Sequence, residues 1–199
     1  MKFYSEMRKM IYDIKRVVGI DEAGRGALAG PLAVAACLLK SQIIGIKDSK
    51  QLSASKRAKL FGEIKSNSSY LILNFSSAQV DEFGLSWCLR TALLIIKAHF
   101  LAEKYEFLYD GNTNFGVSKI QTLVKADSKV MQVGAASILA KVSRDTLMNE
   151  FDKSFVCYGF AHHKGYASKA HIEAIKKFGL SAIHRKSFHL KSLEKSLFD

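Results

Sequence analysis

Carboxylate side chains follow three apolar segments of the chain. Asp21 and Glu22 come after the mostly β-branched segment 14–20. Asp110 and Asp127 each come after another short apolar segment, and we interpret all three segments as strands. Ligand sites in open α/β sheets gather at strand ends, so the four carboxylates can converge. Such a cluster needs cations to stay ionised, and two divalent ions about 4 Å apart would neutralise it and clamp a scissile phosphate.

Each acid also has an ordinary structural interpretation. Asp21 and Glu22 could begin a solvated turn. Asp110 precedes a glycine, which is a common turn pair, and Asp127 could cap the following helix. A fifth acid, Asp145, is more readily a surface residue of that helix. Three strands that end in acids in a basic protein nevertheless favour a cation site.

The two adjacent acids pose a geometric problem. Neighbouring residues of a strand point to opposite faces, so Asp21 and Glu22 can share a site only if the strand breaks there. Gly24 and Gly26, on either side of Arg25, favour such a break and would let a substrate backbone come close. This glycine turn matches neither a phosphate-binding loop nor a dinucleotide fingerprint.

The chain is strongly basic, with 30 Lys and Arg against 18 Asp and Glu and a formal net charge of +12. A basic globular protein tends to bind a polyanion. The basic residues are spread over 47–59, 119–153 and 164–195, which suits a broad groove for nucleic-acid phosphates. A membrane surface would instead call for a basic amphipathic helix with a wide apolar face. We therefore expect a nucleic-acid partner and no membrane.

Length and composition favour one cytoplasmic domain. The 199 residues are 48% hydrophobic and 24% charged, which is typical of a globular chain. The longest apolar run, 33–39, is too short to cross a bilayer, and residues 1–13 lack the apolar core of a secretory signal. Three widely spaced cysteines indicate reduced, mostly buried thiols; they are Cys37, Cys88 and Cys157. We expect a monomer whose single domain spans 1–199.

The pattern of apolar residues predicts an α/β fold. Strands are expected at 14–20, 32–39, 70–76, 107–109 and 119–124. Helices are expected at 54–65, 86–105, 133–151 and 169–178, and the tail 187–199 could add another. Ser53 and Ser168 are the expected N-caps of the first and last of the four. This order predicts a mixed β-sheet flanked by α-helices, with a C-terminal helical part at about 168–199.

Two of these helices carry predictions about packing. The helix 133–151 has small residues, which should let it lie close against the sheet; they are Ala135, Ala136 and Ala140. The helix 86–105 should contribute five core side chains, namely Trp87, Leu89, Leu93, Leu94 and Ile96.

Six motifs occur in one order over nearly the whole chain. They are GIDEAGRGALAGP at 19–31, DSKQLSASKR at 48–57, YDG at 109–111, KADSKVMQVGAASILAKVSRD at 125–145, HKGYASKAH at 163–171 and HRKSF at 184–188. With these motifs the chain resembles bacterial ribonuclease HII, a family of the ribonuclease H-like superfamily. It departs from the family at Ala27, where a proline is common, and at Ala167 and Ser168, which replace a usual Gly-Thr and keep a hydroxyl.

The resemblance implies a type 2 ribonuclease H, an endonuclease and hydrolase. Such enzymes hydrolyse the RNA strand of RNA–DNA hybrids and cut 5′ to a ribonucleotide embedded in duplex DNA, leaving 3′-hydroxyl and 5′-phosphate ends. The family's four metal-binding catalytic acids map onto Asp21, Glu22, Asp110 and Asp127, with Mg²⁺ or Mn²⁺ as the cofactor. In a two-metal mechanism, one ion lowers the pKa of the attacking water and the other stabilises the leaving 3′-oxygen.

The resemblance also implies a set of residues that read the substrate. The family's ribonucleotide-reading Gly-Arg-Gly maps onto Gly24, Arg25 and Gly26, and its junction-sensing tyrosine onto Tyr166. Backbone groups of a glycine loop can approach the 2′-hydroxyl, which distinguishes RNA from DNA. Further phosphate contacts are expected at Lys47, Ser49, Lys50, Lys141 and Lys164, although any of them could be merely solvated.

Other functions fit the sequence less well. A zinc site would have to use Cys157, His162, His163 and His171, whose spacing matches no closed pattern. A non-catalytic nucleic-acid-binding protein has no need of clustered acids, which repel phosphates. A DNA-cutting relative such as a resolvase or integrase would not need a reader of the 2′-hydroxyl. The tail at 194–198 loosely resembles a motif that bacterial sliding clamps bind, but it lacks the glutamine and the first leucine of that motif, so a terminal amphipathic helix explains it better.

Overall fold

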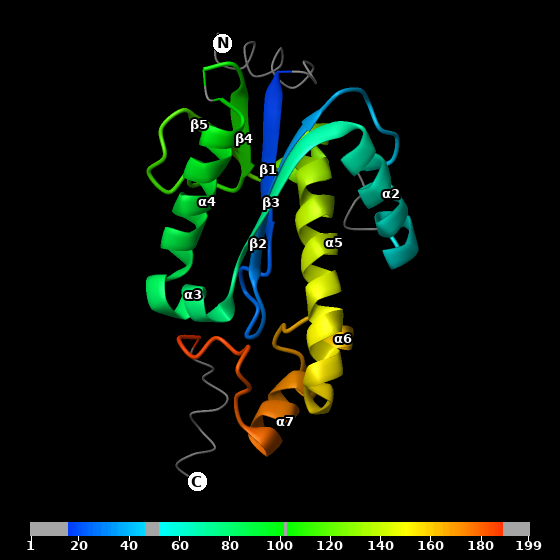
Figure 1. Cartoon of the computed structure of the whole chain (residues 1–199), viewed down its shortest axis with the longest axis vertical. Coiled ribbons are helices and arrows are strands. Elements are labelled where there is room, and N and C mark those ends of the chain that lie inside the picture. Colours follow the sequence, from blue (N-terminus) through cyan, green and yellow to red (C-terminus); the bar gives the residue numbers. More distant parts are fainter. Residues whose placement is uncertain (1–15, 47–51, 102, 189–199) are drawn as a thin grey trace.

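The computed structural model describes residues 16–46, 52–101 and 103–188. Its centre is a five-stranded sheet in the order β3-β2-β1-β4-β5 (Figure 1). The strands are β1 Val17–Ala23, β2 Leu32–Leu39, β3 Ser68–Phe75, β4 Glu106–Asp110 and β5 Ile120–Leu123. Neighbours are antiparallel from β3 to β1 and parallel from β1 to β5. The predicted mixed sheet is therefore confirmed.

Helices flank this sheet and extend beyond one end of it (Figure 1). They are α2 Ala54–Ser66, α3 Ser77–Phe83, α4 Leu85–His99, α5 Met131–Ser154, α6 Phe160–His163 and α7 Lys169–Phe178. Two short 3-10 helices are η2 Ala126–Ser128 and η3 Val156–Tyr158. The caps predicted at Ser53 and Ser168 are both confirmed, since each side chain accepts a hydrogen bond from the backbone N–H three residues later.

Three predicted elements differ from the structure. The helix expected at 86–105 begins at Leu85, ends at His99 and is preceded by the separate helix α3, because Gly84 turns the chain with a φ of 80°. The segment 161–167, where no helix or strand was expected, contains most of α6. The strand expected at 14–20 is found at 17–23, and positions 14 and 15 lie outside the described residues, as does most of the predicted tail helix.

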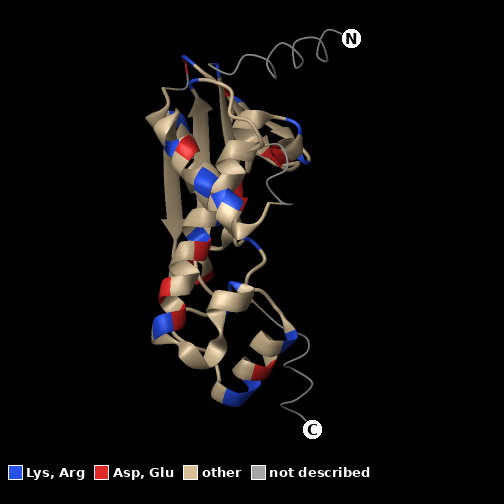
Figure 2. Cartoon of the chain, turned by 90° about the vertical axis from the view of Figure 1, so that its right-hand side faces the viewer, with Lys and Arg blue, Asp and Glu red and all other residues tan. Residues whose placement is uncertain are grey.

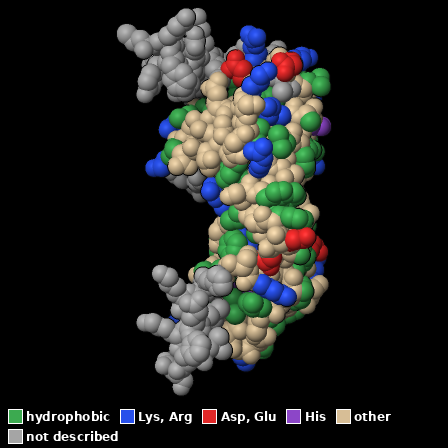
Figure 3. All heavy atoms as spheres, turned by 90° about the vertical axis from the view of Figure 1, so that its left-hand side faces the viewer, with side chains coloured by type: hydrophobic (Ala, Val, Ile, Leu, Met, Phe, Trp, Pro, Cys, Tyr) green, Lys and Arg blue, Asp and Glu red, His purple; other side chains and the backbone are tan. Residues whose placement is uncertain are grey.

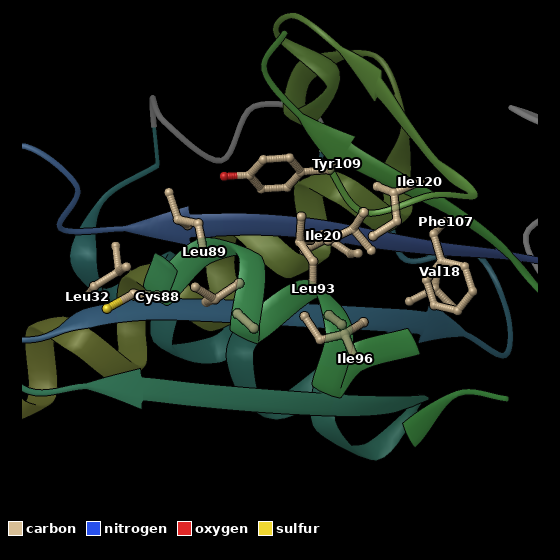
Figure 4. Packing of buried hydrophobic residues seen from close by; sticks show 14 of the residues in the cluster. Val18, Ile20, Leu32, Cys88, Leu89, Leu93, Ile96, Phe107, Tyr109 and Ile120 are labelled. Atoms are coloured by element: carbon tan, nitrogen blue, oxygen red, sulfur yellow. The ribbon is translucent and has the colours of Figure 1, made fainter. Parts of the chain in front are cut away.

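One core cluster lies between the sheet and α4 (Figure 4). Val18 and Ile20 of β1 pack there against Leu89, Leu93 and Ile96 of α4, as predicted for these three leucine and isoleucine side chains. Leu94 and Trp87 were expected in the core as well, but they are 47% and 43% exposed. They belong to an exposed apolar surface of α3 and α4, visible in Figure 3, where Trp87 stacks on Phe83.

The opposite face of the sheet is covered by α5. Ala135, Ala136 and Ala140 are completely buried there, which confirms their predicted role as small residues at a close contact. The approach is close at Gly19 of β1, where a Cβ atom would lie 2.2 Å from the backbone carbonyl carbon of Gln132. The sheet backbone and the start of α5 therefore touch directly, and α5 is held at a fixed height over β1.

Two of the three thiols are buried, as predicted. Cys37 and Cys88 lie in the two core clusters, and burial raises the pKa of the Cys37 thiol to about 12. Cys157 is the exposed one of the three and lies in the short helix η3 at the surface, so the prediction of mostly buried thiols is confirmed by two of them.

The C-terminal elements pack against the far end of α5 (Figure 1). Met148 of α5 meets Tyr158, Phe160 and Ile175 in a separate cluster, which also takes in Leu28 from the loop between β1 and β2. The chain then returns to that loop through a β-bridge between Ala29 and His184. Beyond it, Asp81 of α3 accepts hydrogen bonds from the backbone N–H groups of Lys186 and Ser187. The loop that carries the glycine turn is thus held by C-terminal residues.

Charged side chains are distributed over the whole length of the molecule, with Lys and Arg on both the sheet part and the C-terminal part (Figure 2). None of the helices in the described ranges has the length and apolar character needed to cross a lipid bilayer.

Candidate active site

The first acidic pair lies within β1, which continues to Ala23. The strand break that we predicted there is therefore absent. Asp21 faces α5, where Ser137 forms a hydrogen bond with it, and Glu22 faces the other side, where it accepts a hydrogen bond of 2.5 Å from the Tyr109 hydroxyl. Both carboxylates still line one pocket, because that pocket opens at the end of the sheet and reaches both faces.

Three of the predicted acids meet at this sheet end. Asp21, Asp110 and Asp127 each offer a carboxylate oxygen, and these oxygens all lie within 4.8 Å of one another. The parallel strands explain the meeting: Asp110 is the last residue of β4 beside β1, and Asp127 follows β5 in η2. Asp110 also accepts a hydrogen bond of 3.1 Å from the N–H of Ala126, which holds η2 against β4.

Burial makes this cluster costly without a cation. Burial, followed by the charges of Glu22 and Asp110, raises the pKa of Asp21 to about 8. Burial likewise raises the pKa of Glu22, against the hydrogen bond from Tyr109 and the charge of Arg25. Arg25 cannot neutralise the cluster, since its half-exposed guanidinium lies 3.5 Å from Glu22 alone. A hard divalent cation suits this all-oxygen donor set and would keep the acids ionised.

The glycine turn follows directly. Gly24 has a φ of 89°, and a Cβ atom there would lie 2.0 Å from Nε of Arg144. Both the backbone conformation and the lack of space therefore favour glycine at this position. Its N–H donates a hydrogen bond of 3.1 Å to the hydroxyl of Tyr166. Gly26 is exposed, and a Cβ atom there would meet nothing within 4 Å. The turn is thus tight at Gly24 and open to the pocket at Gly26.

Tyr166 comes to the pocket from the C-terminal part. Its side chain is supported by the Arg144 guanidinium, which lies 5.2 Å from the ring centroid, and the residue is 39% exposed. Arg25 reaches out on the other side, with its guanidinium 5.8 Å from the ring centroid of Phe115. The aromatic ring of Tyr166 and the long cationic side chain of Arg25 therefore line the same pocket as the acids.

The pocket has a volume of about 410 Å³. Its lining residues come from β1, the glycine turn, α2, β4, α5 and the segment before α7; they are Asp21, Glu22, Ala23, Gly24, Arg25, Gly26, Arg57, Asp110, Ser137, Ile138, Lys141 and Tyr166. Arg57 and Ser137 were not predicted. The sequence did hold a signal for both, since they lie inside the motifs at 48–57 and 125–145.

The predicted phosphate contacts fall into three groups. Lys47, Ser49 and Lys50 lie outside the described residues. Lys141 lines the pocket and forms an ion pair of 2.6 Å with Asp145. Asp145, expected at the surface of this helix, is therefore only partly exposed and holds a lysine of the pocket. Lys164 does not line the pocket; its ammonium group donates to Asn149 and to the backbone carbonyl of Ala161.

The histidine rings of the C-terminal part pack against one another. The rings of His163 and His171 lie 4.2 Å apart, and Nε2 of His171 lies 3.0 Å from Nε2 of His184. Within the described ranges, the three aspartates at the sheet end are the one group of His, Cys, Asp and Glu ligands close enough to share an ion.

Solved structures share the architecture. A structure of ribonuclease HII from Archaeoglobus fulgidus in complex with PCNA matches with a TM-score of 0.74 and 27% identity, over 88% of this chain and 96% of that one. Ribonuclease H2 from Pyrococcus horikoshii OT3 matches with a TM-score of 0.69 and 26% identity, over 92% and 98%. The sheet order and the acidic strand ends thus define a protein of the ribonuclease H-like class.

Sequence comparison narrows the class to one family. The ribonuclease HII family model matches residues 18–191. Ribonuclease HII of Campylobacter concisus is 60% identical over 88% of this chain and 94% of its own length. That of Aliarcobacter butzleri is 52% identical over 93% and 100%. The chain belongs to the ribonuclease HII family, and it is accordingly a hydrolase with ribonuclease H endonuclease activity that needs a divalent metal.

Proposed function

We propose that this protein cuts duplex DNA on the 5′ side of an embedded ribonucleotide, as well as the RNA strand of RNA–DNA hybrids. The observation that carries the proposal is the placement of two unlike groups in one pocket. Acids suited to a divalent cation line the same pocket as Arg25 and Gly26, the exposed residues of the glycine turn. Cutting needs the first group, and distinguishing RNA from DNA needs the second.

Asp21, Glu22, Asp110 and Asp127 are the residues that would hold the metal. Two bound Mg²⁺ or Mn²⁺ ions would supply a water of lowered pKa for in-line attack and would stabilise the leaving 3′-oxygen. The chain's own contribution is orientation: Ala126 fixes Asp110 and Tyr109 fixes Glu22 by hydrogen bonds. Expected products carry 3′-hydroxyl and 5′-phosphate ends.

Gly24, Arg25, Gly26 and Tyr166 are the proposed readers of the ribonucleotide. The Tyr166 hydroxyl accepts a hydrogen bond from Gly24, so its own hydrogen stays available for a sugar or phosphate oxygen. Gly26 offers an open backbone position beside Arg25. Lys141 adds positive charge at the pocket, although its pair with Asp145 must loosen before it can bind a phosphate fully.

Two further features are proposed by analogy. The ribonuclease HII of Archaeoglobus fulgidus forms a complex with PCNA, a sliding clamp. This supports a sliding-clamp contact for the present chain, through its C-terminal tail, most of which lies outside the described residues. We also propose that the chain acts as a monomer. A single domain over 1–199 is proposed as well, because the pocket takes residues from β1 to Tyr166.

The test is cleavage of a DNA duplex with one ribonucleotide, beside an all-DNA duplex, with Mg²⁺, with Mn²⁺ and with EDTA. We expect one metal-dependent cut 5′ to the ribonucleotide and an intact all-DNA duplex. Cutting of both duplexes would show a general nuclease on this fold. Binding without any cutting would show a nucleic-acid-binding protein and would refute the proposal.

A further inference from the structure

Two arginine side chains lie almost completely buried beneath the glycine turn. Arg144 is 1% exposed and Arg185 is 2% exposed. Neither forms an ion pair with a carboxylate of the described residues. Burial and the nearby charge of Arg144 lower the pKa of Arg185 to about 10, so it stays protonated at neutral pH. Burying cations without a paired acid is unfavourable for folding, which suggests that they serve the site above them.

Both arginines donate to backbone carbonyls of the loop between β1 and β2. Arg144 holds the end of this loop, at Ala29 and Pro31. Arg185 holds the loop at both ends: Nε and Nη2 donate to the Gly30 carbonyl at 3.1 and 3.0 Å, and Nη1 donates to the Arg25 carbonyl at 3.2 Å. One planar guanidinium therefore ties the two arms of the loop together.

The bond to Arg25 sets the direction of the next N–H group. A trans peptide is planar, so the N–H of Gly26 points opposite to the carbonyl of Arg25. That carbonyl points to the buried Arg185, and the N–H of Gly26 consequently points away from the protein interior. It donates to no group of the described residues, and Gly26 lines the pocket. Donation from a cation to the carbonyl also polarises the peptide and strengthens its N–H as a donor.

We propose that Arg185 is a positioning residue for substrate recognition: it fixes the Arg25–Gly26 peptide so that the Gly26 N–H donates to an oxygen of the bound nucleotide. The acceptor is a 2′-hydroxyl or a phosphate oxygen, both of which accept such a bond. This inference rests on the proposed function, because it names how the ribonucleotide is recognised in the same pocket. Arg185 itself lies below the loop and acts through it.

The direct test is the amide signal of Gly26 in protein labelled with ¹⁵N-glycine. The metal-free protein is titrated with a duplex carrying one ribonucleotide and, separately, with an all-DNA duplex. We expect the Gly26 signal to move downfield with the ribonucleotide duplex. A shift with that duplex alone identifies the 2′-hydroxyl as the acceptor, and equal shifts with both identify a phosphate. An unmoved signal in the wild-type protein would overturn the proposal.

Arg185→Lys keeps the cation but cannot span both arms of the loop with one nitrogen. The Gly26 shift should be lost, and KM for the ribonucleotide duplex should rise at least about fivefold, as expected for one lost hydrogen bond. The turnover number at saturating substrate should change less than about twofold, because the acids are untouched. If the lysine variant folds poorly, Arg185→Gln replaces it in the test, since glutamine keeps one donor group and removes the charge. The same loss of the Gly26 shift and the same rise in KM are expected for it.

Two control variants separate positioning from general stability. Lys186→Ala alters the exposed neighbour and should leave the Gly26 shift and KM unchanged. Ile175→Val loosens the C-terminal cluster that includes Leu28, so it should lower the melting temperature without moving the Gly26 signal. An Arg185→Lys protein that melts earlier but keeps the wild-type shift and KM would refute the inference. Wild-type protein that cuts no ribonucleotide duplex would instead refute the proposed function.

Discussion

The backbone N–H of Gly24 donates a hydrogen bond of 3.1 Å to the hydroxyl of Tyr166, across 142 positions of sequence. This bond joins the loop after β1 to the segment before α7. It places an aromatic ring from the C-terminal part against the turn that follows the two strand acids. Together with the hydrogen bonds from the N–H groups of Leu28 and Ala29 to the Gly165 carbonyl, this bond sets the position of Tyr166 relative to the two strand acids.

Removing the hydroxyl should loosen that contact, and removing the ring should affect recognition further. We expect Tyr166→Phe to lower the free energy of unfolding by about 1 kcal/mol, because the Gly24 N–H loses its acceptor. Tyr166→Ala should reduce discrimination at the RNA–DNA junction more than overall affinity. Cleavage site mapping beside binding measurements checks this, and equal losses on every substrate would contradict the assigned role.

Asp110→Asn tests an acid separately from the fold. The amide oxygen can still accept the hydrogen bond from Ala126, so the melting temperature in EDTA should stay the same or rise as repulsion in the cluster falls. Cleavage with Mg²⁺ should fall by at least about a hundredfold, the scale of losing one electrostatic contact to the transition state. Turnover close to that of the wild type would exclude Asp110 from the site.

The two glycines of the turn should respond differently to alanine. Gly24→Ala forces a positive φ on alanine and collides with Arg144, so it should destabilise the protein by about 2 kcal/mol or more. Gly26→Ala has open space, and its melting temperature should stay within about 2 °C of the wild type, although the added methyl group narrows the pocket. Thermal melts and cleavage rates of both variants check this contrast; equal destabilisation would contradict it.

The histidine pair predicts a loss of stability in acid. Ser181 donates its N–H to Nδ1 of His184, and Nδ1 of His171 contacts the Tyr166 carbonyl, so the facing Nε2 atoms can share only one proton and both rings are neutral. Burial, and then His171, lowers the pKa of His184 to about 4. Burial also lowers the pKa of His171.

At these two histidines the unfolded chain therefore binds more protons than the folded one between about pH 6.5 and pH 4. The contribution of the histidine pair to the free energy of unfolding should fall as the pH drops through this window, by at most about 3 kcal/mol from His184. Denaturant unfolding of the wild type and of His184→Asn, which keeps an acceptor for Ser181, measures the difference at each pH. A difference between the two proteins that does not vary with pH would contradict the account.

The sequence was most informative where local pattern decides structure. The spacing of apolar residues predicted β2 and the main helices. The acids at strand ends predicted which carboxylates lie close together, because parallel strands end at one edge of a sheet. The break expected after Ile20 was wrong, since backbone pairing with β2 continues through both acids to Ala23. The pocket accommodates Asp21 and Glu22 from opposite faces instead.

Long-range contacts could not be predicted. Arginine is a residue type that usually lies at the surface, yet Arg144 and Arg185 are both buried. Their guanidinium groups are accommodated there because backbone carbonyls of the loop between β1 and β2 accept their hydrogen bonds. Likewise, nothing local shows that His171 meets His184. These contacts form when the C-terminal part packs against the loop between β1 and β2. Each buried arginine is more than a hundred positions away in sequence from the loop carbonyls that it contacts.

The central claim is that the acids at the strand ends hold the divalent ions on which cleavage depends. Calorimetric titration of Mn²⁺ and Mg²⁺ into the wild-type protein and into Asp21→Asn/Asp110→Asn, followed by cleavage of the ribonucleotide duplex by the same samples, tests it directly. The account predicts metal binding and a single cut for the wild type, and neither for the double variant, with its folding preserved. Undiminished metal binding or cleavage in the folded double variant would contradict it.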